Sequence, residues 1–195
     1  MPFSEAYLRR IVHNEVVGDF PPFTLGSIAK IENYIRKILA RLSSISNLRV
    51  EAEFAHYGSG FASFVEVRIA KKAGAASNTL GQDQRVAVET NGLTLYISRL
   101  VPYWFYGGST WSETHEDGSY TGGSSIWLQP ESQSSINQSV WQLERKLIEA
   151  VLQEFRYGLL TVEELIQPAP TAISITTELA DKPYKVFDCF FYWQD

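Results

Sequence analysis

The stretch that decides the fold is residues 86–97, which read Val-Ala-Val-Glu-Thr-Asn-Gly-Leu-Thr-Leu-Tyr-Ile. Apolar side chains recur at every second position before and after Asn91-Gly92, which is the period of a β-strand with one buried face. Asn91 and Gly92 both tolerate positive φ, and this pair is the strongest short-range signal for a hairpin. The stretch therefore predicts two antiparallel strands joined by a tight turn.

The same period appears upstream, where residues 48–54 alternate apolar side chains with Arg49, Glu51 and Glu53. Residues 61–69 continue the pattern and predict a further strand, whereas residues 71–83 predict an irregular connection. Downstream, Pro102 ends the strand series, the glycine-rich run beyond it predicts a loop, and residues 126–128 predict a short strand. Strands joined by short connections favour an antiparallel sheet.

Helical periodicity appears in three places, at residues 4–17, 28–42 and 135–157. Ser4 is suited to cap the first helix and Ser135 the third. The aliphatic stripe expected to bury the third helix consists of Ile136, Val140, Leu143, Leu147, Val151 and Phe155. A capping box of Thr161 with Glu164 predicts a fourth, short helix.

These elements predict a single α+β domain spanning residues 1–195. Its antiparallel β-sheet should have about five to six strands, with two to three helices packed mainly on one face. The apolar segment Tyr184–Trp193 predicts a central strand with both faces covered. This aromatic ending, Val186-Phe-Asp-Cys-Phe-Phe-Tyr-Trp193, resembles those of small stand-alone acidic bacterial proteins of uncharacterised or immunity type.

Composition sets the broad class of the chain. Its 195 residues are 45% hydrophobic and 20% charged, as in a globular protein. The single cysteine excludes an internal disulfide. The first residues have neither a basic nor an apolar segment of the secretory kind, and no apolar run is long enough to cross a bilayer. We therefore expect a cytoplasmic protein without a membrane partner.

Charge is distributed unevenly along the chain. Residues 1–100 carry twelve basic and nine acidic side chains, whereas residues 101–195 carry five basic and thirteen acidic ones. Phosphate backbones would be repelled by the second half, so the sequence disfavours nucleic-acid binding. It favours a protein partner with a cationic surface. Oligomeric state leaves no signal in the sequence.

Residues 100–144 contain no Lys or Arg, five carboxylates and eight aromatic rings. Aromatic rings supply contact area at low entropic cost, and carboxylates attract cations. In a strand, alternate residues face opposite ways, so Trp104 and Tyr106 are expected to point outward. The candidate binding residues are Trp104, Tyr106, Trp111, Glu113, His115, Glu116, Asp117 and Tyr120.

No catalytic, cofactor or phosphate-binding motif is present, so we assign no catalytic residue and no cofactor. The cluster Glu113–Asp117 suits a solvated acidic turn better than a metal site. Cys189, with His56 or His115 as a base, could form a nucleophile pair, but its apolar neighbours favour a core residue. Asp188 lies in the same apolar run, and pairing with Arg99 or Arg49 is its simplest explanation.

The sequence thus favours a non-enzymatic binding protein, of bacterial immunity or inhibitor type, with an acidic and aromatic face. The alternative is a small-ligand-binding protein or hydrolase whose pocket is lined by the same aromatic residues. A deep pocket containing His115 or Asp188 would favour the alternative, whereas a flat acidic and aromatic patch would favour a protein partner.

Overall fold

The computed structural model describes residues 3–55, 58, 60–72, 76–80, 85–117 and 119–195. The strands are β1 (Leu48–Glu53), β2 (Phe61–Ala62), β3 (Phe64–Lys71), β4 (Ala76–Leu80), β5 (Arg85–Ser98), β6 (Tyr103–Glu116), β7 (Ser119–Ser125), β8 (Gly158–Leu159) and β9 (Trp193–Gln194). The helices are α1 (Glu5–Val12), α2 (Ile28–Ser43), α3 (Gln138–Glu154), α4 (Val162–Leu165) and α5 (Val186–Phe190). Short 3₁₀ turns are η1 (Phe23–Leu25) and η3 (Pro130–Gln133).

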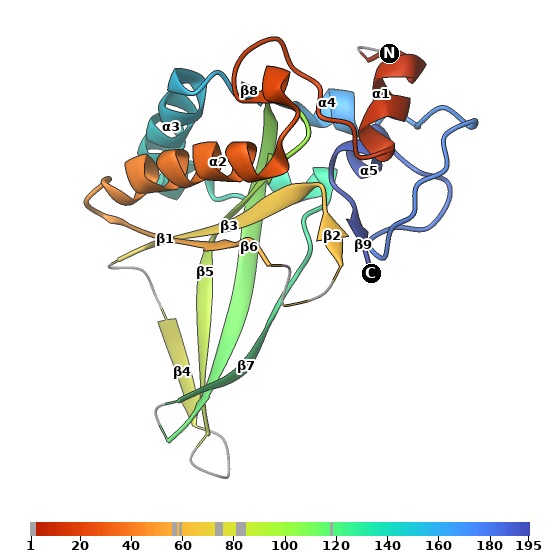
Figure 1. Ribbon diagram of the computed structural model, residues 1–195. Coiled ribbons are helices and arrows are strands. Elements are labelled where there is room, and N and C mark those ends of the chain that lie inside the picture. Colours follow the sequence, from red (N-terminus) through yellow and green to blue (C-terminus); the bar gives the residue numbers. More distant parts are fainter. Residues whose placement is uncertain (1–2, 56–57, 59, 73–75, 81–84, 118) are drawn as a thin grey trace.

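The main sheet has the spatial order β1-β3-β5-β6-β7, with β4 beside β5 and β8 beside β6. Among these strands only β8 pairs in parallel, and the remaining pairs are antiparallel. A separate two-stranded sheet joins β2 to β9. The α+β fold with a largely antiparallel sheet, expected from the sequence, is confirmed (Figure 1).

Helices α2 and α3 cover one face of the sheet (Figure 1). The stripe expected on α2 is buried as the period predicts, at Ile31, Ile35, Ile38 and Leu42. It packs on the side chains of β3 and β5 that face the same way, such as Val67 and Leu95. This layer forms the larger core.

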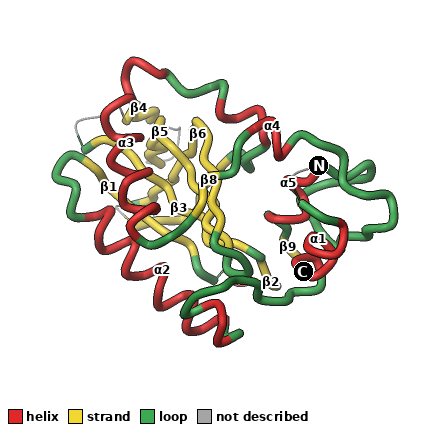
Figure 2. Tube along the Cα trace, turned by 90° about the horizontal axis from the view of Figure 1, so that it is seen from above, coloured by secondary structure: helices red, strands yellow, loops and turns green. Residues whose placement is uncertain are grey.

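A second core lies on the opposite face, where α1, α5 and the carboxy-terminal chain gather (Figure 2). Phe64 of β3 and Tyr96 of β5 stack there at 4.0 Å between ring centroids. Phe105 of β6 joins them and meets Phe187 of α5 edge-on. The body of the sheet is therefore covered on both faces.

The expected hairpin at Asn91-Gly92 does not form, because β5 continues without interruption from Arg85 to Ser98. A Cβ atom on Gly92 would lie 2.3 Å from the Ile69 carbonyl oxygen and 2.6 Å from the Trp111 ring. This glycine is needed for close packing and not for a turn. Tertiary packing has overridden the local turn preference.

The expected glycine-rich loop is also absent, because β6 runs through Gly107 and Gly108 to Glu116. A Cβ atom on Gly108 would lie 2.6 Å from the Ser135 hydroxyl, so this glycine admits the chain that crosses β6. The strand expected at residues 126–128 is replaced by β7, which ends just before it. Within the expected irregular connection, residues 76–80 form β4, and residues 73–75 and 81–83 lie outside the described part of the chain.

The prediction that the aliphatic stripe of α3 is buried is wrong for the three residues at its centre. Val140 and Leu147 are exposed, and Leu143 is 64% exposed. The helix instead buries a face shifted around its axis, which includes Trp141, Glu144, Ile148 and Leu152. Glu144 is stabilised there by Lys71 at 2.7 Å and by the Asn47 amide at 2.9 Å. Because Glu144 is charged, the sequence pattern placed it outside.

Helix ends agree with the sequence in part. The Ser4 hydroxyl accepts a hydrogen bond from the Tyr7 amide at 3.2 Å, and Thr161 with Glu164 forms the expected capping box. The first helix ends at Val12, earlier than expected. The third begins after Asn137 as N-cap instead of Ser135. No helix among the described residues is long and apolar enough to span a bilayer.

The carboxy-terminal run is buried as expected, but it is not a strand of the main sheet. Val186–Phe190 forms α5, and only Trp193–Gln194 is extended. Asp188 pairs with neither Arg99 nor Arg49, and its carboxylate accepts a hydrogen bond from the Lys185 amide at 2.7 Å. It is therefore a helix-capping residue.

Candidate functional site

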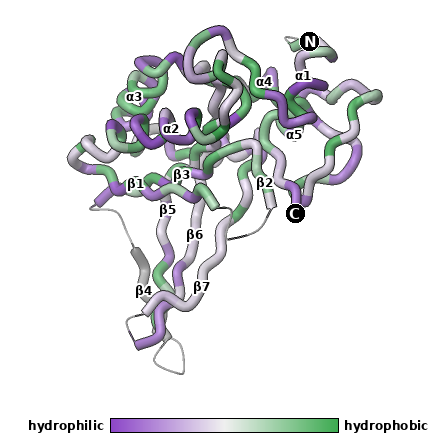
Figure 3. Tube along the Cα trace, in the orientation of Figure 1, coloured by the Kyte–Doolittle hydropathy of each residue, from purple (hydrophilic) through white to green (hydrophobic). Residues whose placement is uncertain are grey.

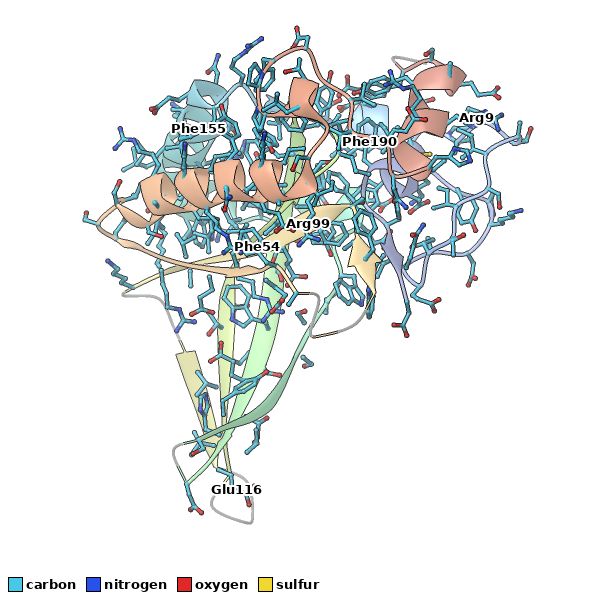
Figure 4. The ribbon with its side chains drawn as sticks, in the orientation of Figure 1. Arg9, Phe54, Arg99, Glu116, Phe155 and Phe190 are labelled. Atoms are coloured by element: carbon cyan, nitrogen blue, oxygen red, sulfur yellow. The ribbon has the colours of Figure 1, made fainter. Side chains whose placement is uncertain are left out.

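The acidic and aromatic segment forms part of an arm that projects from the body of the molecule (Figure 1). The arm consists of β4, the first half of β5, the second half of β6, and β7. Strand β7 is mostly pale in Figure 3, the colour of intermediate hydropathy, and Glu116 lies near the far end of the arm in Figure 4. Such a projection exposes backbone and polar side chains to a partner.

The sheet curls strongly where the arm leaves the body. Arg68 of β3 donates a hydrogen bond to the Ser125 hydroxyl of β7 at 3.1 Å, although β5 and β6 lie between these strands. In a flat sheet, β3 and β7 would be roughly 14 Å apart, which is beyond the reach of these two side chains. The face that carries Arg68 is therefore concave.

This concave face contains a hollow of about 370 Å³. Four carboxylates and one guanidinium line it, together with an imidazole and a phenol ring. They come from both edges of the curled sheet, namely Glu51, Ala52 and Glu53 of β1, Glu66 and Arg68 of β3, Glu113 and His115 of β6, and Tyr120 of β7. The lining carries a net negative charge, which suits a cationic occupant.

The carboxylates of the hollow differ in their surroundings. Glu66 is only 3% exposed, and burial raises the pKa of its carboxyl, although the guanidinium of Arg68, at 2.8 Å, acts in the opposite direction. Glu53 accepts a hydrogen bond from the Ala55 amide at 2.6 Å. Glu51 is exposed beside Arg49, at 3.2 Å. Glu51 is thus the exposed carboxylate of the hollow, and Glu113 is half-buried beside His115, so a ligand can reach both.

His115 and Tyr120 close the arm side of the hollow. They lie opposite each other on β6 and β7, with ring centroids 5.9 Å apart, and the His115 Nε2 atom is 3.6 Å from the Glu113 carboxylate. Tyr120 is 62% exposed. Its hydroxyl reaches Gly123, since a Cβ atom there would be 3.3 Å from the Tyr120 hydroxyl oxygen.

Three of the expected binding residues belong to the interior instead. Trp104 and Tyr106 point toward α2 and α3, not outward, and the Tyr106 hydroxyl donates to Glu149 at 3.3 Å. Trp111 is on the concave face, but it is 1% exposed and covers Gly92. The alternation along β6 was correct, but both faces of the strand are covered in this part of the sheet. None of the three rings offers accessible surface in this conformation.

The remaining expected residues divide between the hollow and the tip of the arm. Glu113, His115 and Tyr120 line the hollow. Glu116 faces the other way, opposite Ser119, and Asp117 is exposed with φ of 50° at the turn beyond it. Within the described ranges, no three histidine, cysteine or acidic side chains gather closely enough to hold a metal ion.

Sequence reasoning missed the lining contributed by Glu51, Glu53, Glu66 and Arg68. The sequence does contain a signal for these residues, because they occupy the polar positions of two strands in which apolar and polar residues alternate. What the alternation could not indicate is that the curl of the sheet brings β1 and β3 opposite β6 and β7.

Cys189 is a core residue in this fold. It is fully buried, and burial raises the pKa of its thiol to about 12, so the reactive thiolate is scarce at neutral pH. The Sγ atom lies 3.8 Å from the Lys185 carbonyl oxygen. His56, one of the bases considered for it, lies outside the described residues.

No known protein family, curated protein or solved structure shows significant similarity to the chain. Its function is therefore argued from the geometry of the hollow and the arm.

Proposed function

We propose that the chain is a non-enzymatic binding protein whose concave face receives a cationic side chain of a partner protein. The observation that carries this proposal is the hollow lined by four carboxylates against one guanidinium. A lysine or arginine side chain entering it would find Glu51 and Glu113 on opposite walls. The exposed Tyr120 ring at the rim suits contact with the apolar stem or with the cation itself.

Long-range electrostatics favour the same partner. Residues 101–195, which include Glu113, His115 and Tyr120 of the hollow, carry an excess of eight acidic side chains over basic ones. Such a field accelerates the encounter with a cationic surface, and salt weakens this effect. The accessible carboxylates should therefore contribute more to the rate of association than to the rate of dissociation.

A second candidate function is the binding of a small organic cation, such as a polyamine. It is favoured by the volume of the hollow, about 370 Å³, which falls within the usual range of ligand sites, roughly 300–1,000 Å³. The hollow also contains His115, the feature that would favour a ligand pocket. Its open form and exposed rim favour the protein partner.

The test uses a fluorescently labelled lysine-rich peptide and the same peptide with every lysine acetylated. Binding is measured by fluorescence anisotropy at low and at high salt. The variant E51Q/E113Q removes the two accessible charges of the hollow. The matched control, E163Q/E178Q, changes the net charge equally at two positions that do not line the described hollow.

We expect wild type and the control to bind the lysine peptide and E51Q/E113Q to bind it at least about tenfold more weakly at low salt. Acetylation should abolish binding. Equal losses in the two double variants would show that net charge alone attracts the peptide and would refute the hollow as its site. Tight binding of spermidine, competing with the peptide, would favour the small-ligand alternative.

A further inference from the structure

Strand β7 is an edge of the main sheet, paired with β6 on one side only among the described strands. Its residues, Ser119 to Ser125, are Ser-Tyr-Thr-Gly-Gly-Ser-Ser, without a charged residue or a proline. Most of them are exposed. The outer row of amide and carbonyl groups of β7 is therefore open to another strand.

Natural sheets usually block such edges with charges, prolines, β-bulges or a covering segment. The opposite edge follows this rule, because β1 carries Arg49, Glu51 and Glu53 within six residues. Strand β4 is also an uncharged edge, but β7 is the one that contributes a described side chain, Tyr120, to the acidic hollow. Strand β7 has a β-bulge opposite Thr114 and His115, and beyond it Gly122–Ser125 pair regularly with β6 and carry no charge. This regular, uncharged stretch of the edge beside an acidic hollow suggests a site for an extended and basic segment.

We propose that an extended, lysine- or arginine-rich segment of a partner protein adds to β7 as a further strand and places a basic side chain in the hollow. This inference rests on the function proposed above and specifies the form of the partner. Backbone hydrogen bonds along β7 would give affinity, and alternate side chains would give specificity.

The geometry of the edge suits this arrangement. Gly123 lies opposite Glu113 across the β6–β7 pair and has no side chain to separate the edge from that carboxylate. An added strand would lie about 10 Å from β6, a gap that a lysine and a glutamate side chain together can span. The stem of the basic side chain would pass Tyr120, whose hydroxyl reaches Gly123.

A second copy of this chain is a less suitable occupant. Pairing two β7 edges would bring together two arms that each carry Glu113, Glu116 and Asp117, with no Lys or Arg between residues 100 and 144. These carboxylates lie on β6 and at the turn beyond it, so the long-range repulsion between two negatively charged arms disfavours their association. Charge complementarity therefore selects a basic segment.

The experiment uses a labelled peptide that alternates lysine with threonine, and two backbone-methylated forms of it. One form carries N-methyl groups on all lysine amides, and the other on all threonine amides. Because successive amides of a strand point to opposite edges, one methylated form loses its hydrogen bonds to β7 and the other keeps them. Both retain every charge. Hydrogen exchange of the β7 amides is followed in parallel.

We expect one methylated form to bind at least about tenfold more weakly than the parent peptide and the other to bind nearly as well. Amides of β7 should exchange more slowly in the complex. Equal affinity of all three peptides, failure of the parent to bind, or unchanged β7 exchange would each overturn strand addition. Dimerisation of the free chain with protection of β7 would also overturn it, since the edge would then be occupied.

The variant E51Q/E113Q separates this inference from the proposed function. If it weakens binding while the methylated peptides bind alike, the hollow binds cations and strand addition is wrong. If methylation is selective while the variant binds normally, β7 accepts a strand and the role proposed for the hollow is wrong.

Discussion

Replacing Gly92 by alanine tests the packing that keeps β5 continuous and supports the concave face. The new methyl group would lie 2.3 Å from the Ile69 carbonyl oxygen and 2.6 Å from the Trp111 ring, whereas ordinary contacts are 3.4–4 Å. The Ile69 oxygen belongs to the backbone of the neighbouring strand β3, so it cannot rotate away. The strands must therefore separate by about 1 Å and the Trp111 ring must also be displaced, and both changes disturb a closely packed region.

Overpacking of this kind typically lowers the free energy of unfolding by ~1–3 kcal/mol. The reduced conformational freedom of the unfolded chain raises it by about 0.4–1 kcal/mol. The matched control is Gly122→Ala on β7, where a Cβ atom meets nothing within 4 Å. Neither glycine has φ in the left-handed region, so backbone strain does not separate them. The unfolded-chain term is common to both substitutions and cancels, so we expect Gly92→Ala to be roughly 1–3 kcal/mol less stable than Gly122→Ala, or to melt about 2–12 °C lower for a chain of this size.

Urea denaturation followed by tryptophan fluorescence measures the difference. Adding Trp111→Leu to Gly92→Ala should relieve the contact with the ring but not the contact with Ile69, so the two effects should be less than additive. If Gly92→Ala and Gly122→Ala unfold at the same urea concentration, the close approach is wrong. The explanation for the missing hairpin would then fail as well.

Three further predictions concern the core and the hollow. Ile148→Asp should lower the free energy of unfolding by roughly 3–5 kcal/mol because Ile148 is buried. Leu143→Asp, on the exposed side of α3, should change it by about 0.5 kcal/mol or less. Similar losses for the two variants in urea denaturation would contradict the buried face. Cys189 should react slowly with a thiol reagent in the native state and rapidly once unfolded, because its pKa is about 12 and it is buried; rapid native labelling would show an accessible thiol. Burial raises the pKa of the Glu66 carboxyl in the folded state above its value in the unfolded chain, about 4.3. Between these two pKa values the native state binds the proton more tightly than the unfolded state does. The contribution of Glu66 to stability should therefore fall as pH rises through that window and should be absent in Glu66→Gln, as measured by unfolding at several pH values; a pH dependence identical in the two proteins would contradict the shift.

Several elements could be predicted because their determinants are local. Helix α2 has one continuous aliphatic stripe, and apolar and polar residues alternate along β1 and along Val65–Ile69 of β3, so periodicity placed them, although the single strand expected over residues 61–69 is divided into β2 and β3. The capping groups of Ser4 and Thr161 act within one turn of their own helices. The presence of both helical and strand periods in the apolar pattern predicted the α+β class.

Other features could not be predicted because they depend on what packs against them. Asn91-Gly92 has the composition of a turn, but the Trp111 ring, nineteen residues beyond Gly92 in the sequence, needs the space that this glycine provides. Val186–Phe190 is apolar throughout, and a short apolar run does not distinguish a strand from a buried helix. On α3, Leu143 is exposed and Glu144 is buried because Lys71 and Asn47 satisfy its charge.

The candidate site shows the same division. The sequence by itself determined the acidic excess of residues 101–195 and the polar faces of the strands, since both depend only on residue type and a period of two. Only the tertiary structure decided that Trp104, Tyr106 and Trp111 are buried while Glu113, His115 and Tyr120 meet Glu51 and Glu66 in one hollow. The physical reason is the curl of the sheet, which arises from packing between distant strands and leaves no periodic signal in any one of them.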